Sequence, residues 1–223
     1  MRSSGWSSRI TLAGLMMSLV AGPTRAADGG DIAGNGTQAG APACASCHGD
    51  RGGGSAADGF PRLAGLARGY LVHELDSFVD GTRQNEIMSP IAQALTPGER
   101  RAVAAFYAAL PASKVAAETS IPDTTVMARG KALAETGAWS KGLPACAQCH
   151  GPGGQGVGPA FPALAGQPAA YLRSQLSAWK AGTRHNDPLG LMKGIAAKLG
   201  EDDGAAAAAY YAALPASPVG GRP

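Results

Sequence analysis

The chain has few of the residues that usually fill a protein core. Of its 223 residues only 5% are aromatic, whereas glycine (33 residues) and proline (16 residues) are abundant. Aromatic side chains bury the largest apolar area per residue. The chain is long enough for two small domains, but its own side chains supply little apolar bulk for their cores.

Long apolar stretches are also absent, except near the N-terminus. Arg2 and Arg9 precede an apolar stretch at residues 10–21, and small residues that a signal peptidase can recognise end at Ala26. The apolar stretch is shorter than the roughly 20 residues that a membrane-spanning helix needs. We predict a signal peptide over residues 1–26, export to the periplasm and no membrane span in the mature chain. A leader that stays uncleaved and acts as an anchor is the alternative.

An excess of basic charge is absent once the leader is removed. The full chain has 19 Lys and Arg residues against 16 Asp and Glu residues, but three of the arginines lie in the leader. The mature chain is therefore formally neutral, and we expect no nucleic-acid partner. Residues 27–119 carry a net charge of −3 and residues 120–223 one of +3. This charge asymmetry could orient docking to a partner, but a chance distribution of charges on a solvated surface explains it equally well.

Cysteines occur only in two copies of one motif, and each motif ends in a histidine. The motifs are Cys44-Ala45-Ser46-Cys47-His48 and Cys146-Ala147-Gln148-Cys149-His150. In the Cys-x-x-Cys-His pattern, the two thiols can add to the two vinyl groups of a haem, and the histidine binds its iron. We predict two covalently bound haem c groups, attached through Cys44, Cys47, Cys146 and Cys149, with His48 and His150 as axial ligands.

These haems would supply the missing core. A redox dithiol or a zinc site is the competing interpretation of the cysteines. A zinc site would need two further ligands at a matching spacing. The thioether bonds would consume all four cysteines and leave none for a disulfide.

The two motifs belong to an internal repeat with an offset of 101 to 104 residues. The segment Phe60-Pro61-Arg62-Leu63-Ala64-Gly65 corresponds to Phe161-Pro162-Ala163-Leu164-Ala165-Gly166, and Gly81-Thr82-Arg83 corresponds to Gly182-Thr183-Arg184. One module is therefore used twice. We predict a first domain over 27–113, a linker over 114–124, a second domain over 125–217 and a tail over 218–223.

Helical signals dominate both modules, and no segment alternates like a strand. Residues 126–135 are expected to form a helix with Thr125 as its N-cap, whereas the corresponding residues 31–40 are glycine-rich and predict a helix poorly. Thr96 opens a capping box, and Gly81 and Gly182 are placed to end helices. The predicted fold class is all-α.

The sixth position on each iron needs a second ligand. Met88 and Met192 occupy matching places in the repeat, and each is expected in a loop before the last helix. We predict them as the axial ligands opposite His48 and His150, because a thioether raises the haem potential and closes the site. Surface methionines without a role are the alternative. His73 and His185 have no histidine at the matching repeat position and are interpreted as ordinary surface or helix residues.

With these motifs, each module resembles a class I c-type cytochrome, and the tandem arrangement resembles the dihaem cytochrome c4 family. The resemblance covers residues 30–217. It implies two all-α domains related by a pseudo-twofold axis, each wrapped around one haem. It also implies that the carbonyl groups of Pro61 and Pro162 accept hydrogen bonds from the axial histidines, and that Arg83 and Arg184 contact haem propionates.

The resulting prediction is a periplasmic electron carrier rather than an enzyme. It would exchange electrons with protein redox partners, for example between a quinol-oxidising complex and a terminal oxidase. One alternative is a dihaem redox enzyme of the peroxidase or thiosulfate-oxidising type, which would need an open or displaceable position at one haem. The other is a fixed electron-transfer subunit of a dehydrogenase.

Overall fold

The computed structural model describes residues 28–112 and 123–216. The predicted signal peptide, nearly all of the predicted linker and the predicted tail lie outside the described residues. Within the described ranges the chain forms helices and a few isolated β-bridges, with no longer strand. The predicted all-α fold is confirmed.

The two modules repeat the same order of helices. The first contains α1 (Gly29–Asn35), α2 (Ala45–His48), α3 (Arg68–Asp80), α4 (Met88–Gln93) and α5 (Pro97–Ala109). The second contains α6 (Thr124–Glu135), η1 (Trp139–Lys141), α7 (Ala147–His150), η2 (Pro152–Gly154), α8 (Ala169–Ala181), α9 (Leu191–Lys198) and α10 (Glu201–Ala213). The short 3-10 helices η1 and η2 have no counterpart among the helices of the first module.

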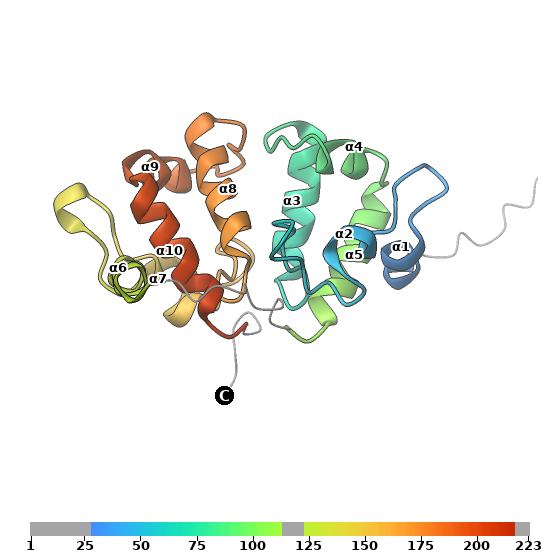
Figure 1. Cartoon of the computed structure of the whole chain (residues 1–223). Helices are drawn as coiled ribbons and strands as arrows, with labels where there is room; N and C mark the ends of the chain where they lie inside the picture. Colours follow the sequence, from blue (N-terminus) through green and yellow to red (C-terminus); the bar gives the residue numbers. More distant parts are fainter. Residues whose placement is uncertain (1–27, 113–122, 217–223) are drawn as a thin grey trace, which may run out of the picture.

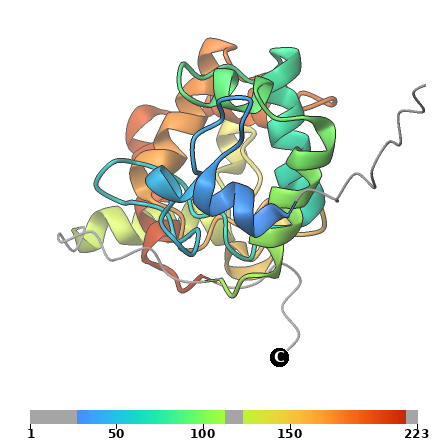
Figure 2. The ribbon, with the colours of Figure 1, turned by 90° about the vertical axis from the view of Figure 1, so that its right-hand side faces the viewer.

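The modules lie side by side, with α3 and α8 facing each other at the centre (Figure 1). Helices α1 and α5 lie on the outer side of α3, and α6 and α10 lie on the outer side of α8. Figure 2 shows the molecule from the side of the first module, with α1 in front. The repeat in the sequence thus becomes a pair of similar helical units that meet through one equivalent helix each.

Several predicted helix ends are confirmed, and one is wrong. Thr96 and Glu99 form the expected capping box at the start of α5, and Gly81 and Gly182 end α3 and α8 in the left-handed conformation. The predicted N-cap at Thr125 is wrong, because Asp123 caps α6 and its carboxylate accepts from Thr125 N at 2.6 Å. Aspartate is a strong N-cap residue, and its position two residues earlier lengthens the helix.

The prediction that residues 31–40 form a helix poorly is wrong for residues 31–35, which belong to α1, whereas residues 36–40 are not helical. Asp28 caps α1, and Gly29 packs directly against the carbonyl group of Ala102 in α5. The equivalent Gly130 in α6 packs against the carbonyl group of Ala206 in α10. A side chain at either glycine would collide with the opposite backbone. The close packing of the helices therefore explains why glycine occurs at these positions, although its helix propensity is low.

Small residues also dominate the rest of the core. Buried alanines such as Ala104 and Ala208 lie beside Tyr107 in α5 and Tyr211 in α10. Larger apolar side chains are buried at Leu71 and Phe78 in α3 and at Leu172 and Trp179 in α8. The helices can approach closely, but they contribute few large side chains to the space between them.

A short antiparallel bridge joins the modules at equivalent residues. Gln84 N donates to Thr183 O at 2.8 Å, and His185 N donates to Thr82 O at 2.7 Å. Arg83 and Arg184 form the bridge pair between them. Each module therefore offers the same segment to the other, as expected for two units related by a pseudo-twofold axis.

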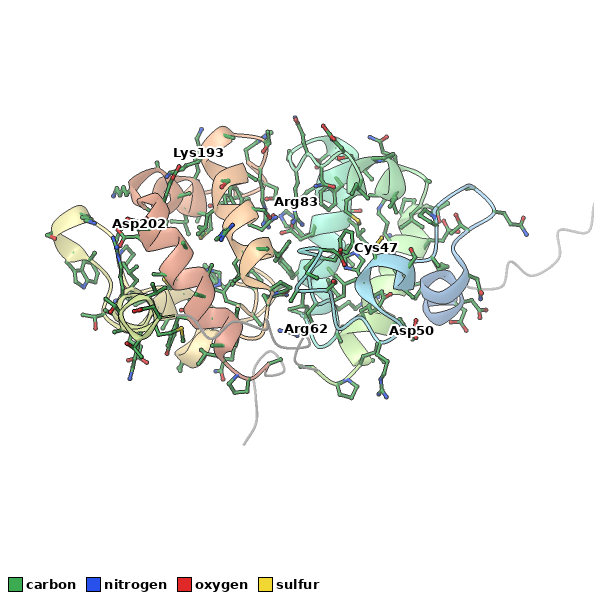
Figure 3. All side chains as sticks on the ribbon, in the orientation of Figure 1. Cys47, Asp50, Arg62, Arg83, Lys193 and Asp202 are labelled. Atoms are coloured by element: carbon green, nitrogen blue, oxygen red, sulfur yellow. The ribbon has the colours of Figure 1, made fainter. Side chains whose placement is uncertain are left out.

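One buried carboxylate lies beside this bridge and holds both arginines. Glu74 in α3 is 2.8 Å from Arg83 and 2.6 Å from Arg184, and all three residues are buried. The position equivalent to Glu74 is Gln175 in α8, whose Oε1 accepts from Arg83 at 2.7 Å and from Arg184 at 3.0 Å. Asn186 also donates to Glu74. Figure 3 shows Arg83 between the two modules.

The charge of Glu74 is stabilised by this cluster. Burial alone would raise the pKa of Glu74, but Arg184, Arg83 and the amide of Asn186 more than offset it, and the pKa lies below its ordinary value. A carboxylate whose pKa is lowered by folding stabilises the folded state when the pH lies above the pKa that the group has in the unfolded chain. This contribution is lost as the pH falls through the pKa of the folded state.

The close approach of α6 and α10 can be tested at Gly130. Replacing Gly130 with alanine places a methyl group against Ala206 O and 2.7 Å from Tyr210 Cβ, so we expect a loss of about 2 kcal/mol of unfolding free energy. Gly34, a helical glycine with nothing within 4 Å of a built Cβ, is the control. Gly34→Ala should be neutral or stabilising by about 0.5–1 kcal/mol in denaturant unfolding. Equal effects of the two substitutions would contradict the packing argument.

The Glu74 cluster predicts a pH-dependent loss of stability. Glu74→Gln leaves two buried guanidinium groups without a carboxylate, and we expect it to cost about 3 kcal/mol near pH 7. The difference from the wild type should be full above the ordinary pKa of glutamate and should shrink as the pH falls from there through the lowered pKa of the folded state. Denaturant unfolding over this pH range measures both. The double variant Glu74→Gln/Gln175→Glu restores one carboxylate and should recover most of the loss; a pH-independent difference would contradict the assignment.

Candidate functional site

Each Cys-x-x-Cys-His motif forms a single helical turn that opens at its first cysteine. Cys44 precedes α2 and Cys146 precedes α7, and His48 N and His150 N donate to the carbonyl groups of these cysteines at 3.0 and 2.9 Å. Residues three apart lie on the same side of a helix. The turn therefore presents the two thiols of each motif together, with the histidine directly after them.

Glycine allows the chain to leave each turn. Gly49 follows His48 with φ 78°, and Gly151 follows His150 with φ 77°. Other residues rarely adopt this left-handed conformation. The histidines can thus end their helical turns while the loops that follow fold back over them.

Both histidines are buried and each makes one hydrogen bond through Nδ1. The distance to the carbonyl oxygen of Pro61 is 2.9 Å for His48, and that to Pro162 is 2.8 Å for His150. Burial lowers the pKa of both imidazoles, and the proline contacts oppose this only partly. A neutral ring that donates from Nδ1 keeps the lone pair of Nε2 available for a metal.

The four cysteines are half-buried and form no disulfide with one another. Burial raises the pKa of Cys44 and Cys146, which favours the neutral thiol over the thiolate. No group of three or more His, Cys, Asp or Glu side chains in the described ranges is arranged to hold a metal ion. Within these ranges, the cysteine motifs do not have the further ligands that a zinc site would need.

Met88 and Met192 lie on short helices, not in the loops that were expected. Met88 is the first residue of α4, and Met192 is the second residue of α9. Asn85 accepts from Met88 N at 2.9 Å, and Asp187 accepts from Met192 N at 2.6 Å. These side-chain contacts secure the start of each helix, so the backbone that carries the methionine is held in place.

A cavity of about 590 Å³ in the first module brings its predicted site residues together. Its walls include Cys44, Cys47, His48, Pro61 and Met88. Apolar side chains from α3, α4 and α5 complete the lining, among them Leu71, Phe78, Ile91, Val103 and Tyr107. The cavity lies in the usual size range of ligand sites and combines thiols, an imidazole and a thioether with apolar walls.

A buried hydroxyl group in each module also fits a bound group. The hydroxyl groups of Tyr107 and Tyr211 are buried beside the thiols of Cys44 and Cys146, which are weak partners, and neither makes a hydrogen bond of ordinary geometry within the described residues. Burial raises the pKa of both phenols, so each remains a neutral donor. Because buried polar groups are usually satisfied, the two equivalent orphaned hydroxyls suit a haem, which carries polar substituents on an apolar ring.

Arg83 and Arg184 line the cavity of the first module and also bind Glu74. The same cavity is lined by Tyr171 and Gln175 of the second module, so it reaches the contact between the modules. One carboxylate faces two guanidinium groups here, which leaves one positive charge to be balanced. The predicted contacts to haem propionates stay a prediction, and this unbalanced charge is compatible with them.

Sequence analysis missed Arg62, which lines the same cavity. Its side chain is fully buried, with NH2 3.1 Å from Ala165 O and an unpaired Nε. Gln167 exchanges two hydrogen bonds with the backbone of Arg62, at 3.0 and 2.9 Å. Burial lowers the pKa of Arg62 to about 10. The repeat offered a signal, because the matching residue is Ala163 and only the first module carries the cation.

The other two histidines lie away from the metal-binding motifs. His73 is exposed, and its Nε2 donates to Asn186 O across the modules at 2.9 Å. His185 is exposed, and its Nδ1 lies 3.1 Å from Gly182 O. Neither lines the cavity of the first module.

In the two described ranges, no helix has the length and apolar character needed to cross a bilayer.

The chain is similar to known proteins over most of its length. A sequence model named Cytochrome c matches residues 33–110 and 127–214. A thiosulfate dehydrogenase electron acceptor from Stutzerimonas stutzeri is 46% identical over 95% of this chain and 96% of its own length. Cytochrome c4 from Pseudomonas aeruginosa is 37% identical over 79% of this chain and 86% of its own length.

Two solved structures share the fold. Thiosulfate dehydrogenase from Marichromatium purpuratum gives a TM-score of 0.78 at 47% identity, over 84% of this chain and 40% of that structure's chain. Cytochrome c4 from Pseudomonas stutzeri gives a TM-score of 0.69 at 32% identity, over 77% of this chain and 93% of the other.

The relatives and the two Cys-x-x-Cys-His motifs identify the cofactor as two covalently bound haems and the role as electron transfer to and from redox partners. The chain belongs to the cytochrome c family, with two tandem cytochrome c domains that resemble those of cytochrome c4.

Proposed function

We propose that this dihaem electron carrier accepts electrons from a thiosulfate dehydrogenase and passes them to a further redox protein. The observation that carries the proposal is the similarity along nearly the full chain to a protein named as the electron acceptor of that enzyme. A second acceptor of this name, from Thiomonas intermedia, is 46% identical over 80% of this chain. A quinol-oxidising complex is the alternative electron donor for the same carrier role.

The proposed haem-binding residues are those of the two motifs and the two matching methionines. Cys44 and Cys47 would hold the first haem and Cys146 and Cys149 the second, while His48 and His150 bind the irons through Nε2. Met88 lines the same cavity as His48, which supports it as the second axial ligand of the first iron. Met192 takes the same role in the second module by its equivalent place in the repeat.

Each haem, when bound, supplies a one-electron change between Fe(II) and Fe(III). The protein sets the conditions for this change. Pro61 and Pro162 orient the imidazoles and increase their donor strength through the Nδ1 hydrogen bonds. A methionine ligand favours the reduced iron, and the apolar walls of the cavity exclude water. No group of the chain needs to exchange a proton or bind a substrate.

The proposed location is the periplasm, after removal of residues 1–26, and the proposed domains are residues 27–113 and 125–217. The family matches at 33–110 and 127–214 fall within these limits. Thr124 already belongs to α6, so the proposed linker ends at or before residue 123.

A dihaem enzyme is the competing function. Such an enzyme would need one iron with an open or displaceable position. The equivalent methionines at the starts of α4 and α9, whose backbone N–H groups donate to the side chains of Asn85 and Asp187, support two closed sites instead. The contact between chain and dehydrogenase is transient in this proposal, and stable co-purification would favour a fixed subunit.

Ligation by Met192 has a direct spectroscopic test. In holoprotein with two haems, Met192→Ala should lower the potential of one haem by tens of millivolts or more, because the iron loses its thioether ligand. It should also remove about half of the weak long-wavelength band of Met-ligated Fe(III) haem and allow CO to bind one reduced haem. Met127→Ala, at a half-buried methionine of α6 outside the repeat, is the control. An unchanged redox titration of Met192→Ala would rule out this ligand.

The proposed electron donor can be tested by rapid mixing. Thiosulfate alone should leave the oxidised holoprotein unreduced, whereas a catalytic amount of thiosulfate dehydrogenase added with thiosulfate should reduce both haems. The absorbance of reduced haem c measures the rate. Reduction by thiosulfate alone would indicate an enzyme, and no reduction in the presence of active dehydrogenase would refute this donor.

A further inference from the structure

The contact between the modules is symmetric in its backbone but not in its side chains. At the bridge, residues 82–84 and 183–185 exchange equivalent hydrogen bonds. Beyond the bridge, one segment of each module continues toward its methionine, Met88 or Met192. Side chains of the first module bind the segment of the second module. Within the described residues, the segment of the first module does not receive the equivalent contacts from the second.

Three side chains of α3 bind Asn186, the residue at which the second segment leaves the bridge. Asn186 Nδ2 donates to Glu74 Oε2 and to Ser77 Oγ, each at 3.0 Å. His73 Nε2 donates to Asn186 O at 2.9 Å. Asn186 is 8% exposed, Ser77 1% and Glu74 6%, so the two bonds from the amide of Asn186 are shielded from water, whereas His73 is exposed.

The residue that follows Asn186 in the sequence contacts the methionine helix. The next residue, Asp187, accepts from Met192 N at 2.6 Å and from Leu189 N at 3.2 Å. Arg184 Nε also donates to Asn186 Oδ1 at 3.1 Å, while its NH2 group donates to Glu74. A continuous series of contacts therefore leads from α3 of the first module to the start of α9 in the second.

The equivalent residue of the first module has no such support. Asn85 is exposed, and its Oδ1 accepts from Ile87 N and Met88 N within its own segment. Within the ranges 28–112 and 123–216, its hydrogen bonds all stay inside the first module. The residues of α8 at the positions of His73 and Glu74 are Ser174 and Gln175; Ser174 donates to Tyr171 O, and Gln175 accepts from the two arginines.

From this asymmetry we propose that α3 of the first module, through His73, Glu74 and Ser77, positions the Met192 segment of the second module. The first module thereby holds closed the axial site of the second haem, while Met88 is positioned by its own module. This inference rests on the proposed ligation by Met192. Asn186 acts through Asp187 and α9, and is a positioning residue rather than a ligand.

The test uses Asn186→Ala in the holoprotein and measures CO binding to the reduced haems instead of electron-transfer activity. Asn186→Ala removes the contacts made by the amide of Asn186 but leaves Glu74 paired with both arginines, so the buried charges stay compensated. We expect reduced Asn186→Ala to bind CO at one haem, with at least a tenfold faster rate than the wild type. The haem affected should be the one that changes in Met192→Ala, identified by its potential and its methionine signals in the NMR spectrum.

Gln167→Ala is the matched control, because Gln167 makes two hydrogen bonds to Arg62 across the modules, and none of its hydrogen bonds within the described residues involves residues 184–192. If Gln167→Ala opens the same haem equally, a general loosening of the interface is responsible and the inference fails. It also fails if Asn186→Ala keeps both sites closed, or opens the haem that Met88→Ala affects. A Met192→Ala variant with unchanged ligand state would instead refute the proposed ligation itself.

Discussion

The shortage of large apolar side chains is the constraint on which the rest of this structure depends. Alanine and glycine allow α1 to approach α5, and α6 to approach α10, until Gly29 and Gly130 meet the backbones opposite. Such helices cannot fill the space between them, and the first module keeps a cavity of about 590 Å³. Two covalently held haems complete these cores, so the cofactors contribute to the fold as well as to the function.

Duplication explains the architecture, and departures from duplication explain how the modules differ. The backbone bridge at Arg83 and Arg184 obeys the pseudo-twofold relation. Glu74 opposite Gln175, and Arg62 in the place of Ala163, do not. Each departure places an additional charge in a buried region, where electrostatic effects are strongest. Two similar haem sites can thus acquire different properties without a change of ligands.

Electron transfer suits a protein built in this way. The imidazole of each motif is held by a backbone carbonyl, and the backbone N–H of each methionine donates to a nearby side chain. Rigid ligands reduce the rearrangement that accompanies a change of oxidation state, and the protein adjusts the potential through ligation, burial and nearby charge. The similarity to electron acceptors of thiosulfate dehydrogenase agrees with this design.

The sequence alone determined the number of modules, the attachment motifs, the helix ends at Thr96, Gly81 and Gly182, and the pairing of residues across the repeat. These features depend on local chemistry and on exact spacing, which a sequence displays directly. The helix at residues 29–35, the placement of Met88 and Met192 on helices, and the buried cluster around Glu74 required the tertiary structure. Helix propensity counts glycine as unfavourable, and only the backbone lying opposite Gly29 shows why a side chain cannot replace it. In the same way, the sequence places a charged residue such as Glu74 at the surface. Only the tertiary structure shows the partners from the other module that allow it to be buried.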